Sequence, residues 1–248
     1  MKYTIMAAGM TALVLSVVGP FARAANNDNA APWLDCLIEP YMVVELASPV
    51  VGIVESVPVD RGSVIKKGQV VATLEAEIER ADIELARARL EYNQRKYARS
   101  EELFKKRIMS SSEKDLAETE KKMAEMELRR SQELLKLRTI RSPVAGVVVE
   151  RFVSPGEVAR QEKILKIAQI DPLNVEVIAP VSMFGAVKTG MRAEVKTDDL
   201  VGQTYKGRVK VIDRVVDAAS GTFGVRVELA NPRYRIPAGL KCKVHFQK

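Results

Sequence analysis

The chain has few of the side chains from which metal sites, disulfide frameworks and catalytic centres are built. Its 248 residues include two cysteines and one histidine, too few for a zinc site made of those residues or for a disulfide-dense scaffold. Neither Gly-x-Ser-x-Gly nor His-Glu-x-x-His occurs, so no motif supports a hydrolase. We therefore expect a protein that is not an enzyme and that needs no metal or other cofactor.

Aromatic side chains are also scarce, at 5% of the residues with a single Trp, which argues against a large core built around rings. Apolar residues make up 47% of the chain, enough to fill a core, and they exclude a disordered chain. The length indicates one to two domains. The formal net charge of +7 has the sign that attracts nucleic acids and anionic membranes.

Residues 1–24 have the three-part pattern of a secretory signal peptide. Lys2 precedes an apolar run, Ile5–Val18, and Ala22-Arg23-Ala24 resembles a cleavage site. The run is shorter than the roughly 20 residues that span a bilayer. We expect cleavage after Ala24, a flexible lead-in over residues 25–34, and a mature protein in the periplasm. Export makes nucleic acid a poor partner.

An internal repeat with an offset of 94 residues is present. The run Ser48-Pro49-Val50-Val51-Gly52-Ile53-Val54 recurs as Ser142-Pro143-Val144-Ala145-Gly146-Val147-Val148, and Gly62 matches Gly156. Short Val and Ile runs that alternate with Gly and Pro are typical of strands and turns. We expect positive φ at Gly62 and Gly156. Residues 48–74 and 140–169 are each too short to bury a sheet face alone, so we predict that the two copies pack face to face as one small sandwich.

Between the copies, residues 69–142 contain neither Gly nor Pro, and residues 75–139 carry 15 acidic and 16 basic side chains. Less polar positions recur there at alternating spacings of three and four, the pattern of a heptad seam. This pattern predicts two antiparallel helices, 75–107 and 113–139, with Ser112 as the amino-terminal cap of the second. We expect Glu75, Glu77 and Glu79 to lie on a solvated face. The seam positions are Ile83, Ala86, Leu90, Asn93, Tyr97, Ser100 and Phe104, followed by Ala117, Lys121, Ala124, Leu128, Ser131 and Leu135.

Residues 170–248 are predicted to form a small β-barrel. Five short segments alternate apolar and polar residues or are rich in Val, and turn residues separate them. One short helix is expected at Met183–Val187. The strand-like segment 35–47 precedes the first repeat and is expected to complete this barrel from the other end of the chain.

Taken together, residues 35–248 resemble the periplasmic adaptor subunits, or membrane fusion proteins of HlyD and RND type, of tripartite efflux and type I secretion systems. The repeats are similar to the two halves of the family's lipoyl-like domain, and Ser220–Glu228 with Asn231-Pro232 is similar to the end of its barrel. The resemblance implies a mainly β fold: a lipoyl-like β-sandwich interrupted by a coiled-coil hairpin, followed by a small β-barrel. Many relatives continue into a membrane-proximal domain, which we expect to be absent here.

The resemblance also implies a contact with a TolC-like outer-membrane channel. Adaptors that dock on such channels have Arg, Leu and Ser at a set spacing around the hairpin turn, and Arg99, Leu103 and Ser110 fit that spacing. Arg99 and Leu103 share a helix face at i, i+4. Ile108, Met109 and Ser111 would then form the rest of the tip. An ordinary helix surface is the alternative interpretation of these residues.

The family's partners are an inner-membrane transporter, a TolC-like channel and further copies of the adaptor, usually six. We favour an RND-type transporter that exports small molecules. The alternatives are an ABC-type exporter or type I secretion system, and an envelope scaffold without a transport role.

A lipoyl-type acyl carrier is rejected, because Ile78 stands where the attachment Lys would be.

The two cysteines lie near opposite ends of the exported chain. The chain is expected to run out along the helical hairpin and back again. The segments before the first repeat and after the second should therefore meet in one barrel, which would bring Cys36 close to Cys242. An oxidising compartment favours a disulfide between them. Two free, buried thiols are the alternative.

Overall fold

The computed structural model describes residues 32–160, 162–197 and 203–247. The predicted signal peptide and residues 25–31 of the predicted lead-in lie outside the described residues. Within the described part of the chain, no helix is both long and apolar enough to cross a membrane. The helices and strands are β1 (Leu34–Ala47), β2 (Val51–Ser56), β3 (Val64–Ile65), β4 (Val70–Leu74), α1 (Glu77–Lys105), α2 (Ser111–Leu137), β5 (Thr139–Arg141), β6 (Gly146–Arg151), β7 (Val158–Arg160), β8 (Lys163–Pro180), η1 (Val181–Met183), β9 (Arg192–Thr197), β10 (Thr204–Ile212), β11 (Thr222–Leu229), η2 (Pro232–Tyr234) and β12 (Lys241–Phe246).

A closed barrel is formed by β1, β12, β9, β10, β11 and β8, in that order, and the pairing of β1 with β8 closes it. Strand residues alternate between the interior and solvent. Ile38, Val195 and Val227 are among the fully buried side chains of its core. The fold is therefore mainly β with a helical hairpin, as the sequence pattern predicted.

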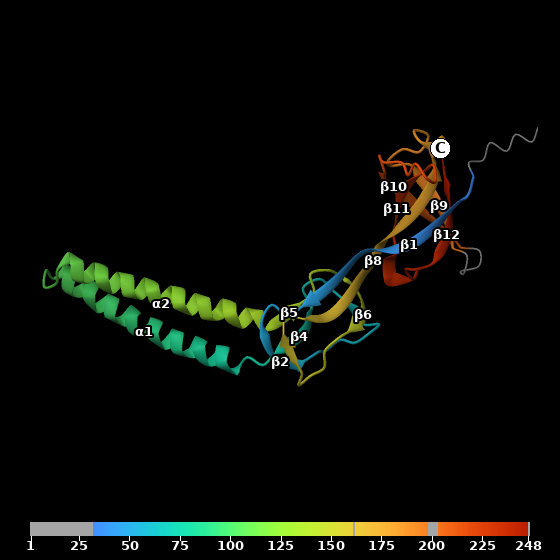
Figure 1. Ribbon diagram of the computed structural model, residues 1–248. Helices are drawn as coiled ribbons and strands as arrows, with labels where there is room; N and C mark the ends of the chain where they lie inside the picture. Colours follow the sequence, from blue (N-terminus) through green and yellow to red (C-terminus); the bar gives the residue numbers. More distant parts are fainter. Residues whose placement is uncertain (1–31, 161, 198–202, 248) are drawn as a thin grey trace, which may run out of the picture. The chain divides into compact units, whose positions relative to one another are not determined.

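Strands β1 and β8 are longer than the barrel needs. Residues 36–40 of β1 pair with β8 residues 173–177 in the barrel, and residues 42–47 pair with β8 residues 163–169 beyond a β-bulge. The two strands thus run side by side from the barrel into the sandwich (Figure 1). The segment 35–47, which we assigned to the barrel alone, contributes to both units.

The repeats form the sandwich, but each sheet is built from both copies. Strand β2 of the first copy pairs with β7 of the second, and β3 of the first pairs with β6 of the second. The copies are therefore interlocked, and do not simply pack face to face. Their shared core includes Val54, Val71, Val148 and Leu165.

Matching hydrogen bonds show the internal two-fold relation. The Gly62 amide donates to the Val148 carbonyl at 2.8 Å, and the Gly156 amide donates to the Val54 carbonyl at 2.8 Å. Both glycines have positive φ, 86° and 88°, as predicted. Ser48 and Ser142 are buried, and each hydroxyl donates to the carbonyl two residues later, Val50 or Val144.

The hairpin consists of α1 and α2, which pack along the predicted seam. All seam positions are buried or half-buried except Phe104, which is 38% exposed. Its fully buried members are small: Ala86, Ser100, Ala117 and Ala124. Small side chains bury little apolar area, so ion pairs between the helices add to the contact: Arg89–Glu127 at 2.7 Å and Lys96–Glu120 at 2.5 Å.

Two local predictions were wrong. Helix α2 is capped by Ser110 and not by Ser112, which lies inside the helix. The short helix expected at Met183–Val187 is a single 3-10 turn that begins earlier, at Val181.

Candidate functional site

The tip of the hairpin is a tight turn between α1 and α2. Helix α1 ends where Arg107 adopts a left-handed conformation, with φ of 59°. The Ile108 amide then donates to the Leu103 carbonyl at 2.9 Å. This geometry leaves Ile108 71% exposed, whereas Met109 is half-buried. The tip therefore presents an apolar side chain to solvent.

Ser110 has a structural task at the start of α2. Its hydroxyl accepts from the Glu113 amide at 3.2 Å and donates to the Glu113 carboxylate at 2.8 Å, and its own amide donates to that carboxylate at 3.0 Å. This is a reciprocal capping box. The hydrogen bond from the Ser110 amide, followed by the one from its hydroxyl, lowers the pKa of Glu113. Any contact of Ser110 with another molecule would compete with these bonds.

Arg99 and Leu103 lie one helical turn apart on α1 and are both exposed. Neither belongs to the seam, and Arg99 forms no ion pair among the described residues. Ser111, the first residue of α2, is also exposed. The structure thus leaves a cationic group, an apolar group and the exposed tip residue Ile108 free to meet a partner.

Apolar side chains outside the seam form a second feature that our sequence reasoning missed. Ile78, Leu85 and Tyr92 of α1 recur every seven residues and are each more than half exposed. On α2, Leu116 and Met123 do the same. The signal was present as a second heptad spacing beside the seam. We refer to these five residues as the apolar stripes of the hairpin.

At the base of the hairpin, Arg138 joins three elements. Its guanidinium donates to the Glu79 carboxylate, with Nε at 2.8 Å, and to the Val51 carbonyl at 3.0 Å. The side chains of Arg138 and Glu79 are only 20% and 14% exposed. The prediction that Glu79 lies on a solvated face was wrong, because Arg138, at the end of α2, forms an ion pair with Glu79 and covers it. Ile78, which also lies in the first turn of α1, is exposed, so the other side of this turn does face solvent.

Cys36 and Cys242 are direct partners in the pairing of β1 with β12. Their Cα atoms lie 4.8 Å apart, and the sulfur atoms form a disulfide. The bond therefore joins the first strand of the barrel to its last.

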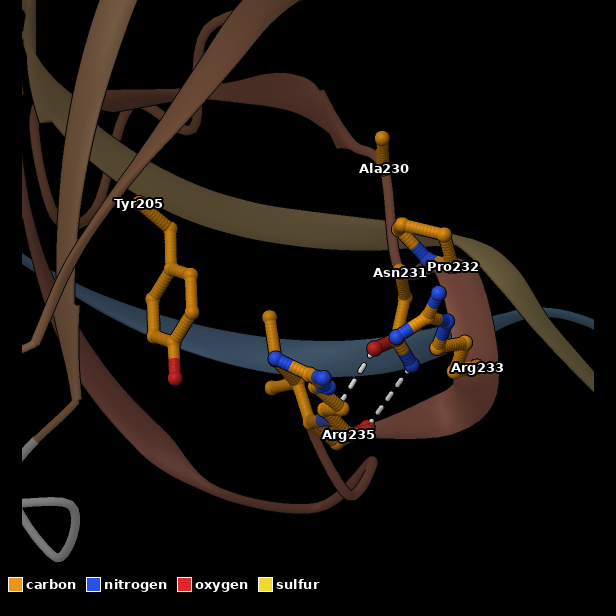
Figure 2. A pocket seen from close by; sticks show the side chains of 7 residues that line it. Tyr205, Ala230, Asn231, Pro232, Arg233 and Arg235 are labelled. Atoms are coloured by element: carbon orange, nitrogen blue, oxygen red, sulfur yellow. Dashed lines mark hydrogen bonds between the residues drawn. The ribbon is translucent and has the colours of Figure 1, made fainter.

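The loop after β11 shapes a pocket on the barrel (Figure 2). Buried Asn231 accepts from the Ile236 amide at 2.9 Å and donates to the Ile236 carbonyl at 2.9 Å. Arg233 and Arg235 border the pocket together with Tyr205. Asn231 thus determines the course of the loop, while the arginines remain at the surface.

No group of three His, Cys, Asp or Glu side chains within residues 32–160, 162–197 and 203–247 has the arrangement of a metal site. The candidate functional features of the described residues are three surfaces: the hairpin tip, the apolar stripes and the barrel exterior.

Comparison with known families agrees with this architecture. Residues 42–169 match the family model of the CzcB-like barrel-sandwich hybrid domain, and residues 173–248 match that of the CusB-like β-barrel domain. The first match ends, and the second begins, within β8, where the strand passes from sandwich to barrel.

Two curated relatives and one solved structure illustrate the similarity. An uncharacterised protein of Haemophilus influenzae is 24% identical over 77% of this chain and 50% of its own length, and the cation efflux system protein CzcB of Alcaligenes is 24% identical over 76% and 39%. The chain thus spans half or less of these relatives. A MacA–MexA chimera with the Pseudomonas aeruginosa MexA α-hairpin is 18% identical over 88% of this chain and 79% of its own, with a TM-score of 0.74. The chain belongs to the membrane fusion protein family, with a CzcB-like barrel-sandwich hybrid domain and a CusB-like β-barrel.

Proposed function

We propose that this protein is a periplasmic adaptor that links an inner-membrane transporter of RND type to a TolC-like outer-membrane channel for the export of small molecules. The observation that carries the proposal is the hairpin, whose exposed tip offers Arg99, Leu103 and Ile108 at the end of two helices inserted in the sandwich. The family match supports an adaptor role. The protein would be held at the inner membrane through its transporter.

Docking at the tip is tested with Arg99→Asp. Reversal of this charge should abolish export while the protein still folds and accumulates, because Arg99 is exposed and forms no ion pair among the described residues. Arg95→Asp is the matched control, since Arg95 lies one turn away on the same helix and forms only an exposed pair with Glu91. Unchanged export in the Arg99→Asp strain, or equal loss in both strains, would contradict the proposal.

The partners are identified by photo-crosslinking from Ser111 at the tip and from Thr222, the first residue of β11. We expect a channel protein from Ser111 and a transporter from Thr222. Recovery of an ATP-binding transporter would favour the ABC-type alternative over the RND type. Recovery of neither a transporter nor a channel would favour an envelope scaffold.

Cations are the cargo class to test first, because the Alcaligenes relative is named as a cation efflux protein. Deletion strains that carry the wild-type or the Arg99→Asp gene would be compared for cellular zinc, cobalt and cadmium. We expect wild-type protein alone to lower these contents. Equal contents in both strains, with export of an organic dye restored only by wild type, would point to a different cargo.

Assembly into a ring of six is part of the same proposal. The apolar stripes support it, since Leu85 and Tyr92 lie exposed on α1 and face away from the seam. Because Leu85 and Tyr92 are 52% and 57% exposed in the hairpin, burying the rest of each side chain against a neighbouring copy is worth about 1 kcal/mol. Leu85→Glu with Tyr92→Glu should shift the protein toward monomers in sedimentation, whereas Arg95→Gln should not.

A further inference from the structure

The outer side of β12, β9 and β10 carries an unbalanced set of charges. Val195, Val209 and Val244 face the barrel core, and because strand residues alternate, their neighbours face outward. Seven of these outward side chains are cations, and all are exposed. Lys210 is paired with Glu228, and we call the surface formed by the other six the basic face. Its cations are Arg192, Lys196, Lys206, Arg208, Lys241 and Lys243.

Like charges stand opposite each other across the strands of the basic face. Arg192 is the register partner of Arg208, and Lys196 is that of Lys243. Directly opposed like charges destabilise an antiparallel pair. Three acidic side chains also lie opposite cations of this surface: Asp35 faces Lys243, Glu194 faces Lys206, and Glu228 faces Arg208. Cations still outnumber these carboxylates, and Glu194 accepts a hydrogen bond from Gln247 at 2.7 Å. Residues 198–202, which include Asp198 and Asp199, lie outside the described residues.

The adjoining strands of the same barrel are arranged in the opposite way. Lys210 of β10 pairs with Glu228 of β11 at 3.2 Å, and Arg226 of β11 pairs with Glu176 of β8 at 2.5 Å. Opposite charges thus face each other across β10, β11 and β8. The repulsion on the basic face is therefore local to this surface and is not a general property of the barrel.

Trp33 adds an amphipathic ring to the basic face. Lys196 Nζ lies 4.3 Å from the centre of its ring, and the His245 ring lies 5.3 Å away. Trp33 is nevertheless 40% exposed. Tryptophan is enriched where proteins meet the membrane–water interface, because one part of the ring is apolar and its N–H is polar.

We propose that the basic face binds the phosphate headgroups of an anionic lipid bilayer. The outer surface of the barrel carries these cations at strand spacing, which suits many small anions that lie side by side, and the arginine fork matches phosphate oxygens. The exposed Trp33 favours a lipid surface over an acidic protein segment, since it can enter the headgroup layer. This membrane contact adds to the adaptor role and does not depend on docking at the hairpin tip.

Co-flotation of the purified chain with vesicles tests the proposal. Vesicles of phosphatidylglycerol and phosphatidylcholine should bind the protein, whereas pure phosphatidylcholine vesicles should not, and high salt should release it. Replacement of Arg192, Lys196, Arg208 and Lys243 by Gln should weaken binding on the order of 1,000-fold, because each cation near an anionic lipid surface contributes about a factor of five. The matched control replaces four hairpin cations by Gln: Arg80, Arg95, Lys105 and Lys136.

The control has the same net charge, so equal weakening in both variants would overturn the proposal. So would wild-type binding that ignores phosphatidylglycerol, or crosslinking of Lys206 to an acidic protein without vesicle binding. Thermal unfolding provides a separate check on folding. The substitutions remove opposed like charges together with the cross-strand pairings of Arg208 with Glu228 and of Lys243 with Asp35. Because all of these side chains lie at the surface, the basic-face variant should unfold close to the wild-type temperature.

Discussion

At the scale of single residues, glycine decides how closely β6 can approach β8 within the second repeat. A Cβ on Gly146 would meet the backbone carbonyl of Ala168, which cannot move aside. Gly146→Ala should therefore destabilise the protein by about 3 kcal/mol, the upper part of the range for overpacking. Ala145→Ser is the control, since Ala145 directly precedes Gly146 and is exposed. Denaturant unfolding measures both; a shift below about 0.5 kcal/mol for Gly146→Ala would contradict the close contact.

Ser110 allows capping to be separated from recognition. Ser110→Ala should cost about 1 kcal/mol through loss of the cap, whereas Ser110→Asn should cost little, because Asn also caps helices. If the hydroxyl itself contacts a channel, both variants lose export. If Ser110 acts only as the cap, Asn retains export, and the measurement is export in cells beside unfolding in solution.

Glu113 makes the start of α2 sensitive to acid. Hydrogen bonds from the amide and then the hydroxyl of Ser110 hold its pKa below the ordinary value of 4.5. A lowered pKa in the folded state means that the contribution to stability is complete above the unfolded-state pKa and is lost as the pH falls through the folded-state pKa. The stability difference between wild type and Glu113→Gln should therefore shrink as the pH falls below 4.5. A difference that stays constant on acidification would rule out this role.

At the scale of elements, Arg138 holds both helices to the sandwich. Arg138→Ala leaves the Glu79 carboxylate largely buried without its partner and removes the bond to the Val51 carbonyl. We expect a loss of about 2 kcal/mol, below the 3–5 kcal/mol of a fully buried pair, because both side chains retain some exposure. Lys136→Ala removes an exposed pair with Glu133 and should cost less than about 0.5 kcal/mol. Equal unfolding of both variants would show that the base of the hairpin does not depend on Arg138.

At the scale of the whole molecule, the disulfide ties the two ends of the described chain. Cys36 and Cys242 are 206 residues apart in sequence, so the bond restricts the unfolded chain by about 5 kcal/mol in the chain-entropy model. Replacement of both by Ser should lower the denaturant midpoint. Reductant should lower the midpoint of wild type similarly and leave the variant unaffected. Identical wild-type midpoints and peptide masses with and without reductant would exclude the bond.

Much of the candidate site was predictable, for reasons that differ between residues. The hairpin followed from heptad spacing, and the glycine turns followed from the repeat, because these patterns are local. The cap at Ser110 was missed although Ser110-Ser111-Ser112-Glu113 contains a Ser-x-x-Glu capping box. Any of the three consecutive serines could serve as the helix cap. Which one does so depends on the turn before α2, where Arg107 adopts a left-handed conformation.

Sequence alone determined the kinds of element, their order and the existence of two related halves, since side-chain periodicity and turn residues act over a few positions. The tertiary structure decided how the halves interlock, that Glu79 meets Arg138 across 59 residues, and that β12, β9 and β10 gather their cations on one surface. The physical reason is that strand register and long-range pairing bring together side chains whose separation in the sequence carries no signal.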